Sequence, residues 1–265
     1  MKAACFSVAA MDFFPQQNQH FAGGNSLNQT IRYRQLGHAS AFIGALGTDA
    51  AGQRIAALLQ RRAVDVSHLY RLEGRTACNQ LINDTAGERY GVEGAWQSGV
   101  YVEFRLSAAD WDFIGGFDVW STHADGPNYL PALERKTKTQ FMSVDFLHLK
   151  DYALLERSLR TIDIAYFGGT PDMADDLAKV ARASRGLIVL TLGAAGSMAF
   201  AGDRIYKQPA LPIERVVDTT GCGDAFQAAF TASYFHSRDV VSSLWAGATL
   251  GREAARTFGG VPWES

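Results

Sequence analysis

The stretch VVDTTGCGDAFQAAF, from Val216 to Phe230, decides the fold prediction because it joins a glycine-rich loop to an apolar run with helical spacing. Gly221 and Gly223 allow the chain to turn tightly. Such a turn presents backbone N–H groups at the N-terminus of the following helix, where the helix dipole favours an anion. We therefore interpret this loop as an anion-binding site. The alternative is an ordinary turn with an acidic residue in the first helical turn.

Asp224 directly follows the glycines and lies at the start of the predicted helix. A carboxylate at this point would repel a phosphate group that simply rested there. Its presence is better explained if it accepts a proton from a hydroxyl group that attacks the phosphate. The stretch therefore predicts phosphoryl transfer to an alcohol.

The composition of the 265-residue chain fits one large domain, or a domain with a small accessory part. Hydrophobic residues make up 47% and charged residues 20%, which allows a sizeable core and argues against disorder. The net charge of -2 argues against a general binder of nucleic acid or membrane surfaces. Three cysteines without metal or disulfide spacing indicate a reducing compartment. With no secretory signal and no apolar run of about 20 residues, we expect a cytoplasmic protein.

Predicted strands and helices alternate along most of the chain, which predicts a mostly parallel sheet covered on both faces. Ligands of such sheets bind beyond the carboxyl ends of the strands. The residues that fall at these ends are Asp12, His123, Asp145 and Gly193. The predicted strands lie at residues 3–10, 39–45, 117–123, 141–146, 162–167 and 186–193. The predicted helices lie at residues 27–36, 108–111, 130–138, 173–183 and 242–258, and a further one has Asp49 near its cap, continues through residues 55–59 and ends around Arg61 and Arg62.

Residues 69–104 interrupt this alternation with short apolar runs around a turn at residues 84–87. The pattern predicts a hairpin-like insert that forms a lid or a minor sheet. Arg89 and Glu93 lie where they could reach a substrate. The alternative is that they form the solvated face of an edge strand.

The segment Gly23-Gly24-Asn25-Ser26-Leu27-Asn28 opens a predicted helix with two glycines. Asn25 and Asn28 are three residues apart, so at a helix start they share a face. Each amide offers donors and an acceptor, which suits a ligand with many hydroxyl groups. The alternative is a plain helix cap by Asn25 or Ser26.

The order of these motifs resembles the PfkB (ribokinase-like) family of sugar and nucleoside kinases. The resemblance rests on Gly23 to Asn28, Gly44 to Gly52, Thr191 to Gly193 and Asp218 to Asp224, and it spans nearly the whole chain. The short length, the start at Asp12-Phe13-Phe14-Pro15 and the stretch Val144-Asp145-Phe146 are most similar to the fructoselysine 6-kinase branch of this family.

The resemblance implies an α/β fold, a ribokinase-like three-layer sandwich with a mostly parallel central sheet and a small β-lid. Residues 1–265 would form one kinase domain, with lid segments near residues 12–21 and 70–104. The implied activity is transfer of a phosphoryl group from ATP, with Mg²⁺, to a sugar. No Walker motif with its lysine occurs, so the chain would not be a P-loop enzyme.

Carried over by position, the family implies a role for individual residues. Asp224 would be the general base, and the N–H groups of Gly221, Cys222 and Gly223 would stabilise the transferring phosphoryl group. The residues implied for sugar hydroxyls are Asp12, Gly24, Asn25 and Asn28. The residues implied for the nucleotide site are Thr191, Gly193 and Gly196, with Asp218 and Thr219 shaping the loop.

The sequence departs from the family pattern at two places. The region from Gly168 to Asp176 has neither residue of the Asn-x-x-Glu segment that the family often carries for metal and phosphate; Asp172, Asp175 or Asp176 would have to substitute through water. Cys222 occupies a position where the family usually has alanine. It is either a substitute of similar volume or a thiol with a lowered pKa at a helix N-terminus.

The branch resemblance predicts phosphorylation of the primary 6-hydroxyl of a fructosamine-type sugar such as fructoselysine or fructose-asparagine. The alternatives are a kinase for a plain ketohexose, a pentose or a nucleoside, or a catalytically degenerate binding protein of the same fold. The candidate residues for binding the amino-acid portion of such a sugar are Arg89, His123, Asp125 and Asp145. An exposed apolar face of the lid would further predict a homodimer.

Overall fold

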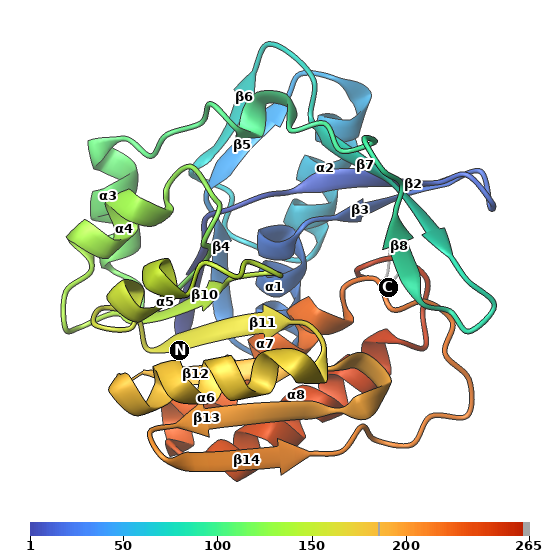
Figure 1. The fold of residues 1–265 in the computed structure, drawn as a ribbon. Helices are drawn as coiled ribbons and strands as arrows, with labels where there is room; N and C mark the ends of the chain where they lie inside the picture. The colour runs from blue at the N-terminus through green and yellow to red at the C-terminus, as the bar shows by residue number, and fades with distance from the viewer. Residues whose placement is uncertain (185, 262–265) are drawn as a thin grey trace.

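A mostly parallel sheet runs through the centre of the computed structural model, which describes residues 1–184 and 186–261 (Figure 1). Among the described residues it contains eight strands in the order β14-β13-β12-β11-β10-β9-β1-β4. All pairs from β12 to β4 are parallel, whereas β13 and β14 at one edge pair antiparallel. The strands are β1 Lys2–Cys5, β4 Ala39–Phe42, β9 Val119–His123, β10 Phe141–Asp145, β11 Ile164–Gly168, β12 Leu187–Thr191, β13 Ser197–Ala201 and β14 Arg204–Gln208.

Helices cover both faces of this sheet, because its central strands are apolar on both sides. In β12, Ile188 and Leu190 face one helical layer while Leu187 and Val189 face the other, as the alternation of side chains along a strand requires. One layer holds α3, α4, α5 and α6, and the other holds α1, α7 and α8 (Figure 1). The helices are α1 Asn25–Gln35, α2 Ala50–Arg61, α3 Ala108–Gly115, α4 Tyr129–Arg135, α5 Tyr152–Ser158, α6 Ala174–Ala183, α7 Cys222–Ser237 and α8 Val240–Ala254.

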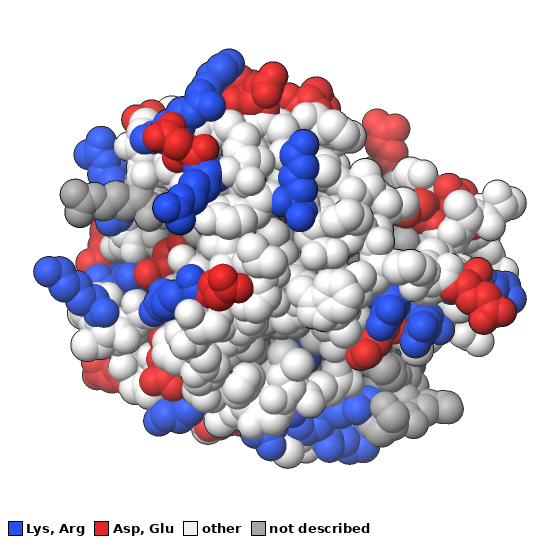
Figure 2. Space-filling model, turned by 90° about the horizontal axis from the view of Figure 1, so that it is seen from below, with Lys and Arg blue, Asp and Glu red and all other residues white. Residues whose placement is uncertain are grey.

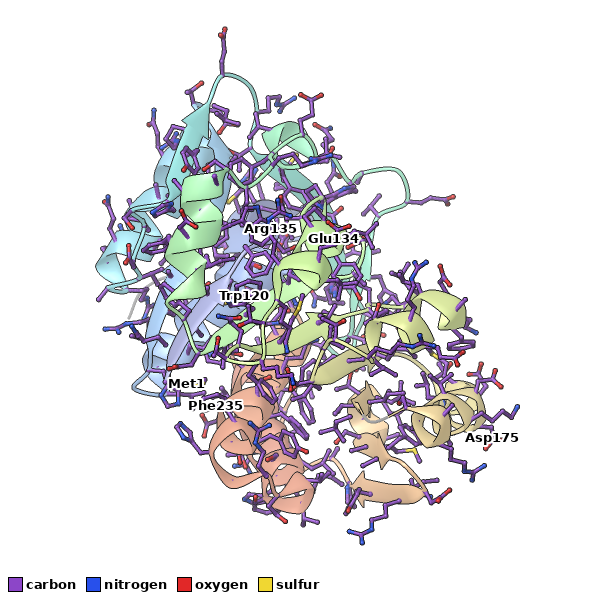
Figure 3. The ribbon with its side chains drawn as sticks, turned by 90° about the vertical axis from the view of Figure 1, so that its left-hand side faces the viewer. Met1, Trp120, Glu134, Arg135, Asp175 and Phe235 are labelled. Carbon is purple, nitrogen blue, oxygen red and sulfur yellow. The ribbon has the colours of Figure 1, made fainter. Side chains whose placement is uncertain are left out.

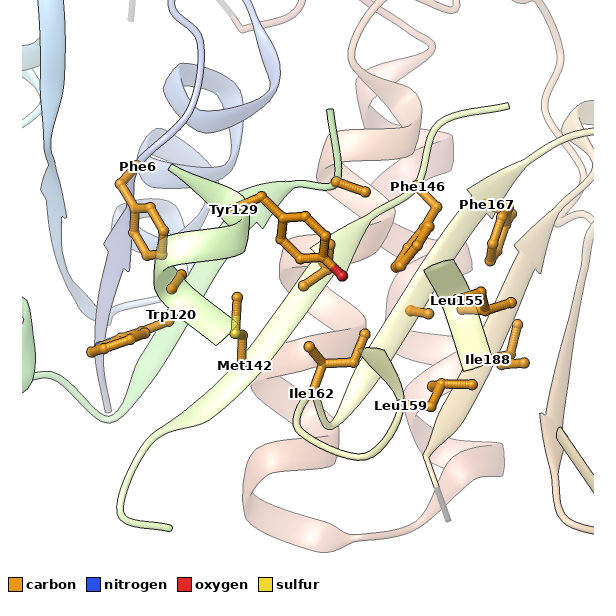
Figure 4. Close-up of a cluster of buried hydrophobic side chains, with 14 of the residues drawn as sticks. Phe6, Trp120, Tyr129, Met142, Phe146, Leu155, Leu159, Ile162, Phe167 and Ile188 are labelled. Atoms are coloured by element: carbon orange, nitrogen blue, oxygen red, sulfur yellow. The ribbon is translucent and has the colours of Figure 1, made fainter. Parts of the chain in front are cut away.

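Figure 4 shows the apolar layer between the sheet and α4 and α5. Aromatic rings pack there in contact pairs: Phe146 stacks on Phe167 with ring centroids 5.2 Å apart, and Tyr129 meets Phe146 edge to face at 6.0 Å. The Tyr129 hydroxyl is buried but donates to the Ser158 hydroxyl at 2.5 Å, so the ring adds apolar area without leaving an unpaired polar atom.

A second sheet lies beside the carboxyl ends of the central strands (Figure 1). Its order is β3-β2-β7-β8, from β2 Ala10–Phe14, β3 Gln19–Gly23, β7 Ala77–Asn83 and β8 Arg89–Gly91. β7 and β8 form the hairpin that the insert predicts. A separate parallel pair joins β5 Gly44–Gly47 to β6 Leu69–Leu72. Three short 3-10 turns complete the chain: η1 Gly99–Tyr101, η2 Pro171–Met173 and η3 Gly193–Ala195.

Two predicted strands are wrong, for a common reason. The strand predicted at residues 3–10 is divided between β1 and β2, and the one predicted at 39–45 between β4 and β5, which belong to different sheets. Residues 6–9 and Ile43 remain buried while the chain crosses from one sheet to another. The apolar run therefore continues from one strand into the next, so hydropathy does not reveal where the first strand ends. Asp12 consequently lies on β2 in the second sheet, and not at a carboxyl end of the central sheet.

The other predicted elements agree with the structure to within a few residues, and helix α5 has no counterpart among the predictions. Asp49 caps α2 as expected, because its Oδ1 accepts from the Gly52 amide at 2.9 Å. The small-residue helix α8 packs near the anion loop: a Cβ on Gly251 would lie 3.4 Å from the Cys222 carbonyl oxygen.

Charges are mixed on the face drawn in Figure 2, where Lys and Arg lie among Asp and Glu around a largely uncharged centre. None of the helices within residues 1–184 and 186–261 has both the length and the apolar character needed to cross a lipid bilayer.

Candidate functional site

The predicted anion loop turns into α7 through Gly221, which has a φ of 73°. A Cβ there would lie 2.6 Å from the Gly260 Cα, so both the backbone conformation and the close approach require glycine. The Cys222 amide donates to the Thr219 carbonyl at 3.2 Å. The amides of Gly221, Gly223 and Asp224 have no acceptor among the described residues. The free donors at this helix N-terminus therefore differ from the predicted set in one member, because the Asp224 amide takes the place of the Cys222 amide.

Asp224 is held by the two asparagines of α1. Asn25 Nδ2 donates to Asp224 Oδ1 at 2.8 Å, and Asn28 Nδ2 donates to Asp224 Oδ2 at 2.7 Å. Burial raises the pKa of Asp224, while the Asn28 amide lowers it and the neighbouring Asp145 charge raises it again. The sequence prediction that Asn25 and Asn28 share one face of a helix start is confirmed, and that face points at the carboxylate.

Asp145, at the end of β10, belongs to the same hydrogen-bond network. Its Oδ2 accepts from Asn25 Nδ2 at 3.0 Å and from Gln227 Nε2 at 2.9 Å, while its Oδ1 accepts from the Leu147 amide at 2.7 Å. Asp145 therefore both caps the following turn and lies beside Asp224. Gln29 Nε2 donates to Gln227 Oε1 at 2.7 Å and extends the network into the core.

Gln227 is a functional residue that the sequence analysis does not single out. It is the one polar residue in the run Ala225 to Phe230, three positions after Asp224, and it is buried. A single amide within an apolar helical run, one turn from a predicted base, is the signal that could have identified it.

Three buried polar atoms at the site have no partner within residues 1–184 and 186–261: Asn25 Oδ1, Asn28 Oδ1 and His123 Nε2. His123 ends β9 beside Asp145 in the sheet register, and its Nδ1 lies 3.6 Å from Asp125 Oδ1. A buried polar atom without a partner costs about 1–3 kcal/mol, so such atoms indicate a site that a ligand completes. The two amide oxygens accept hydrogen bonds, as sugar hydroxyls require.

Asp12 reaches the site from the second sheet and is 7% exposed. Its carboxylate packs against Gly23. A Cβ at position 23 would lie 2.0 Å from Asp12 Oδ2, so this close approach requires glycine. Burial raises the pKa of Asp12 to about 7; the Arg89 charge lowers it, and Asp224 and Asp218 raise it. Arg89 itself is exposed on β8, and Gly24 forms the N-cap of α1.

Asp218 is fully buried and ties three segments together. Its Oδ1 accepts from Asn83 Nδ2 at 2.8 Å and from the Thr220 amide at 3.0 Å, and its Oδ2 accepts from the Gly259 amide at 2.8 Å. Thr219 adds a second link to the β7–β8 hairpin, because its hydroxyl accepts from the Arg89 amide at 2.9 Å. The two residues predicted to shape the loop thus also attach the hairpin to it.

A cleft of about 550 Å³ lies on the other side of the hairpin. Of the predicted nucleotide residues, Gly193 lines it, whereas Thr191 at the end of β12 and Gly196 at the end of η3 do not. The sequence analysis does not assign the other residues that line this cleft, which are Glu88, Tyr90, His148, Lys150, Gly169, Thr170, Met173, Leu192 and Ala194.

The three aspartates that could substitute for the missing Asn-x-x-Glu pair lie outside the cleft. Asp172 is exposed and pairs with Lys150 at 3.6 Å, and Asp176 pairs with Lys179 at 2.9 Å. Asp175 points away from the sheet at the outer side of α6 (Figure 3). None of the three lines the cleft. Within the described part of the chain no group of three His, Cys, Asp or Glu side chains could hold a metal ion by itself.

Cys222 is not an activated thiol. Burial raises its pKa to about 12, and the Asp218 charge acts in the same direction. The thiol therefore stays protonated at neutral pH, and the interpretation of Cys222 as a volume substitute holds.

Comparison with known proteins identifies the family. Residues 12–132 and 163–263 match the model of the pfkB family carbohydrate kinases. The chain belongs to the PfkB family. It is therefore an ATP-dependent carbohydrate kinase, as the resemblance in the sequence implies.

Among curated relatives, this kinase is 27% identical to fructosamine kinase FrlD of Bacillus subtilis, over 97% of this chain and 89% of the relative. It is 30% identical to fructoselysine 6-kinase of Escherichia coli K12, over 84% and 85% of the two chains. The fold matches Arabidopsis thaliana ribokinase complexed with ribose and ATP, with a TM-score of 0.82 at 19% identity over 99% of this chain and 95% of that one. The ribokinase-like fold predicted from sequence is confirmed.

The site geometry predicts an unusual titration of Asp12. Substitution Arg89→Gln should raise the Asp12 pKa above the wild-type value of about 7, because it removes the positive charge that favours the carboxylate. Carboxyl ¹³C NMR of aspartate-labelled protein measures this pKa. Arg61→Gln, at the exposed end of α2, is the matched control and should leave it unchanged. An Asp12 that titrates near 3.8 in the wild type would contradict the buried environment described here.

Proposed function

We propose that this kinase phosphorylates the primary 6-hydroxyl of a fructosamine-type sugar, such as fructoselysine or fructose-asparagine. The observation that carries the proposal is the Asp224 carboxylate, held by Asn25 and Asn28 at the head of a loop with free amides. Similarity to a fructosamine kinase and a fructoselysine 6-kinase supports the acceptor class.

The charge of the site also supports a conjugated sugar. Burial raises the pKa of both Asp12 and Asp224; the Asp224 charge raises the Asp12 pKa further, and the Asp145 charge does the same to Asp224. A fructosamine carries a basic nitrogen that a plain ketohexose lacks, and a protonated amine stabilises neighbouring carboxylates. His123 and Arg89, with Asp145, would contact the amino-acid portion of such a substrate.

In the proposed reaction, Asp224 accepts the proton of the 6-hydroxyl as that oxygen attacks the γ-phosphorus of ATP. The bond from the γ-phosphorus to the oxygen that bridges the β- and γ-phosphates breaks in the same transfer, and ADP is the leaving group. Asn25 and Asn28 fix the carboxylate and offer their free Oδ1 atoms to other sugar hydroxyls, together with Asp12 and the backbone at Gly24. The amides of Gly221, Gly223 and Asp224 stabilise the charge that develops on the transferring phosphoryl group. The Asp224 proton then leaves to solvent.

ATP would occupy the cleft lined by Gly193, His148 and Lys150, with Thr191 and Gly196 supporting its wall. Its γ-phosphate would extend past Thr219 to the anion loop. The second sheet, with segments near residues 12–21 and 70–104, would act as a lid that excludes water and suppresses ATP hydrolysis.

The residues that line the cleft fit Mg²⁺ only if phosphate oxygens of ATP supply part of its coordination. Such an ion typically takes one or two protein carboxylates and keeps several waters. Glu88 is the one carboxylate that lines the cleft, and its Oε2 already accepts from the Thr219 hydroxyl at 3.2 Å. We therefore assign Glu88 as the residue that would hold Mg²⁺, which neutralises phosphate charge when bound.

Removal of the proposed base gives the first test. Asp224→Asn should lower kcat by about 10²–10⁴-fold, because an amide cannot accept the hydroxyl proton. Calorimetry should still detect binding of sugar and nucleotide. Asp203→Asn, which changes a carboxylate that is 93% exposed on the surface, is the control and should leave kcat unchanged. Wild-type turnover in Asp224→Asn would overturn the assigned mechanism.

An ATP-consumption screen tests the acceptor. With Mg²⁺ present, fructoselysine or fructose-asparagine should give saturable turnover, whereas fructose, ribose and adenosine should give a lower kcat/KM. Turnover on fructose alone would assign a plain ketohexose as the acceptor instead. The 27% identity to a fructokinase of Salmonella typhimurium supports this alternative. Turnover on ribose or adenosine alone would assign the pentose or nucleoside alternative.

We also infer that the lid sheet pairs with that of a second copy. Its exposed apolar side chains, Ile82 at 38% and Trp96 at 46%, support a contact of this kind. Sedimentation at micromolar concentration should show a dimer that Trp96→Glu dissociates. Trp245→Glu, on α8 and more exposed at 56%, should leave it intact. A wild-type monomer would rule out the pairing.

A further inference from the structure

Arg32 is a buried cation that the proposed mechanism does not use. It lies on α1 one turn after Asn28 and is 4% exposed. Its Nη2 donates to the Gly260 carbonyl at 3.0 Å and its Nη1 to Gln35 Oε1 at 3.0 Å, while its Nε is buried without a partner. Among the described residues, no carboxylate forms a salt bridge with it.

A guanidinium in this position remains charged, because arginine does not lose its proton in proteins. Burying a charge without a counter-ion is unfavourable, so the fold would be more stable with an apolar side chain of similar length. The position of Arg32 therefore needs an explanation beyond packing.

The contacts of Gly260 connect Arg32 to the site. A Cβ on Gly221 would lie 2.6 Å from the Gly260 oxygen, and a Cβ on Gly260 would lie 2.5 Å from Asn28 Nδ2. Gly260 therefore packs between the anion loop and Asn28, which holds Asp224. By donating to the Gly260 carbonyl, Arg32 holds Gly260 in this position.

The charge of Arg32 also acts on the site. Burial lowers the pKa of the guanidinium, while the negative charges of Asp224 and Glu253 raise it. Because the interaction of two charges is mutual, the guanidinium favours the ionised form of Asp224. The charge of Arg32 also reaches the start of α7: burial and the Asp218 charge raise the pKa of Cys222, whereas Arg32 lowers it. The free amides of Gly221, Gly223 and Asp224, where the transferring phosphoryl group would stand, flank this residue.

We propose that Arg32 is a positioning residue for phosphoryl transfer: it holds Gly260 against the anion loop and supplies a fixed positive charge behind the loop and Asp224. The proposal rests on the proposed roles of Asp224 and the loop amides. It assigns to Arg32 no contact with either substrate, so its effect should appear in kcat and not in KM.

The test compares Arg32→Met, Arg32→Lys and Arg34→Met in the full-length enzyme. Arg34 is the matched control, because it lies on the same helix and also donates to a backbone carbonyl, that of His38 at 3.1 Å, away from the loop. Arg32→Met should lower kcat by about tenfold, which is less than the ~10²–10³-fold effect of losing a direct oxyanion donor. KM values for ATP and sugar should change by less than about threefold.

The pH profile separates a charge effect from a structural one. With the positive charge removed, the pKa of Asp224 rises, so the acidic limb of the kcat profile of Arg32→Met should move to higher pH. Arg32→Lys keeps a charge and should restore most of kcat and the wild-type limb, while Arg34→Met should match the wild type throughout.

Two outcomes would overturn the proposal. One is wild-type kcat in Arg32→Met; the other is a lowered kcat with an unmoved acidic limb and no rescue by Arg32→Lys, which would make Arg32 a structural residue only. Either is distinguishable from failure of the proposed mechanism, which would appear instead as full turnover in Asp224→Asn.

Discussion

The structure depends on the pair of amide-to-carboxylate bonds that join α1 to α7. Asn25 and Asn28 donate to the two oxygens of Asp224 from positions 199 and 196 residues away along the chain. All three side chains come from the first turn of a helix, and both helices cover the same face of the sheet. The central strands serve to hold these two helix starts against one another. A carboxylate fixed at both oxygens has one orientation, which is what a proton acceptor in an in-line transfer needs.

A second constraint attaches the lid hairpin to this centre. Asp218 accepts from Asn83 of β7 and from Gly259 near the described end of the chain, and it is fully buried. The same carboxylate therefore fixes the loop that precedes the free amides and the base of the hairpin. Glu88 and Tyr90 of that hairpin line the cleft beside Gly193. A movement of the hairpin would therefore alter both the cleft and the loop that Asp218 fixes. One buried residue thus joins the loop at the start of α7 to the hairpin that lines the cleft.

The sequence predicted the parts of the site that lie within short motifs. The loop from Asp218 to Asp224 and the pair Asn25 and Asn28 were recognisable, because glycine, amide and carboxylate spacing within one helical turn is a local property. Gln227 and Lys150 were not, since each acts through a partner or a cleft made by distant segments. The breaks after Cys5 and at Ile43 were missed because the chain stays apolar and buried while it passes between sheets.

By itself, the sequence determined the α/β class and the family, and it located the candidate loop and base, since these follow from periodicity and from residues near one another in the chain. Only the tertiary structure decided that Asp12 reaches the site from the second sheet, that the Cys222 amide is already engaged, and that Arg32 lies buried behind the loop. The physical reason is that burial, and the choice among possible hydrogen-bond partners, depend on how whole segments pack; Arg32 and Gly260, for example, are 228 residues apart. No local pattern of side chains encodes which of those segments will meet.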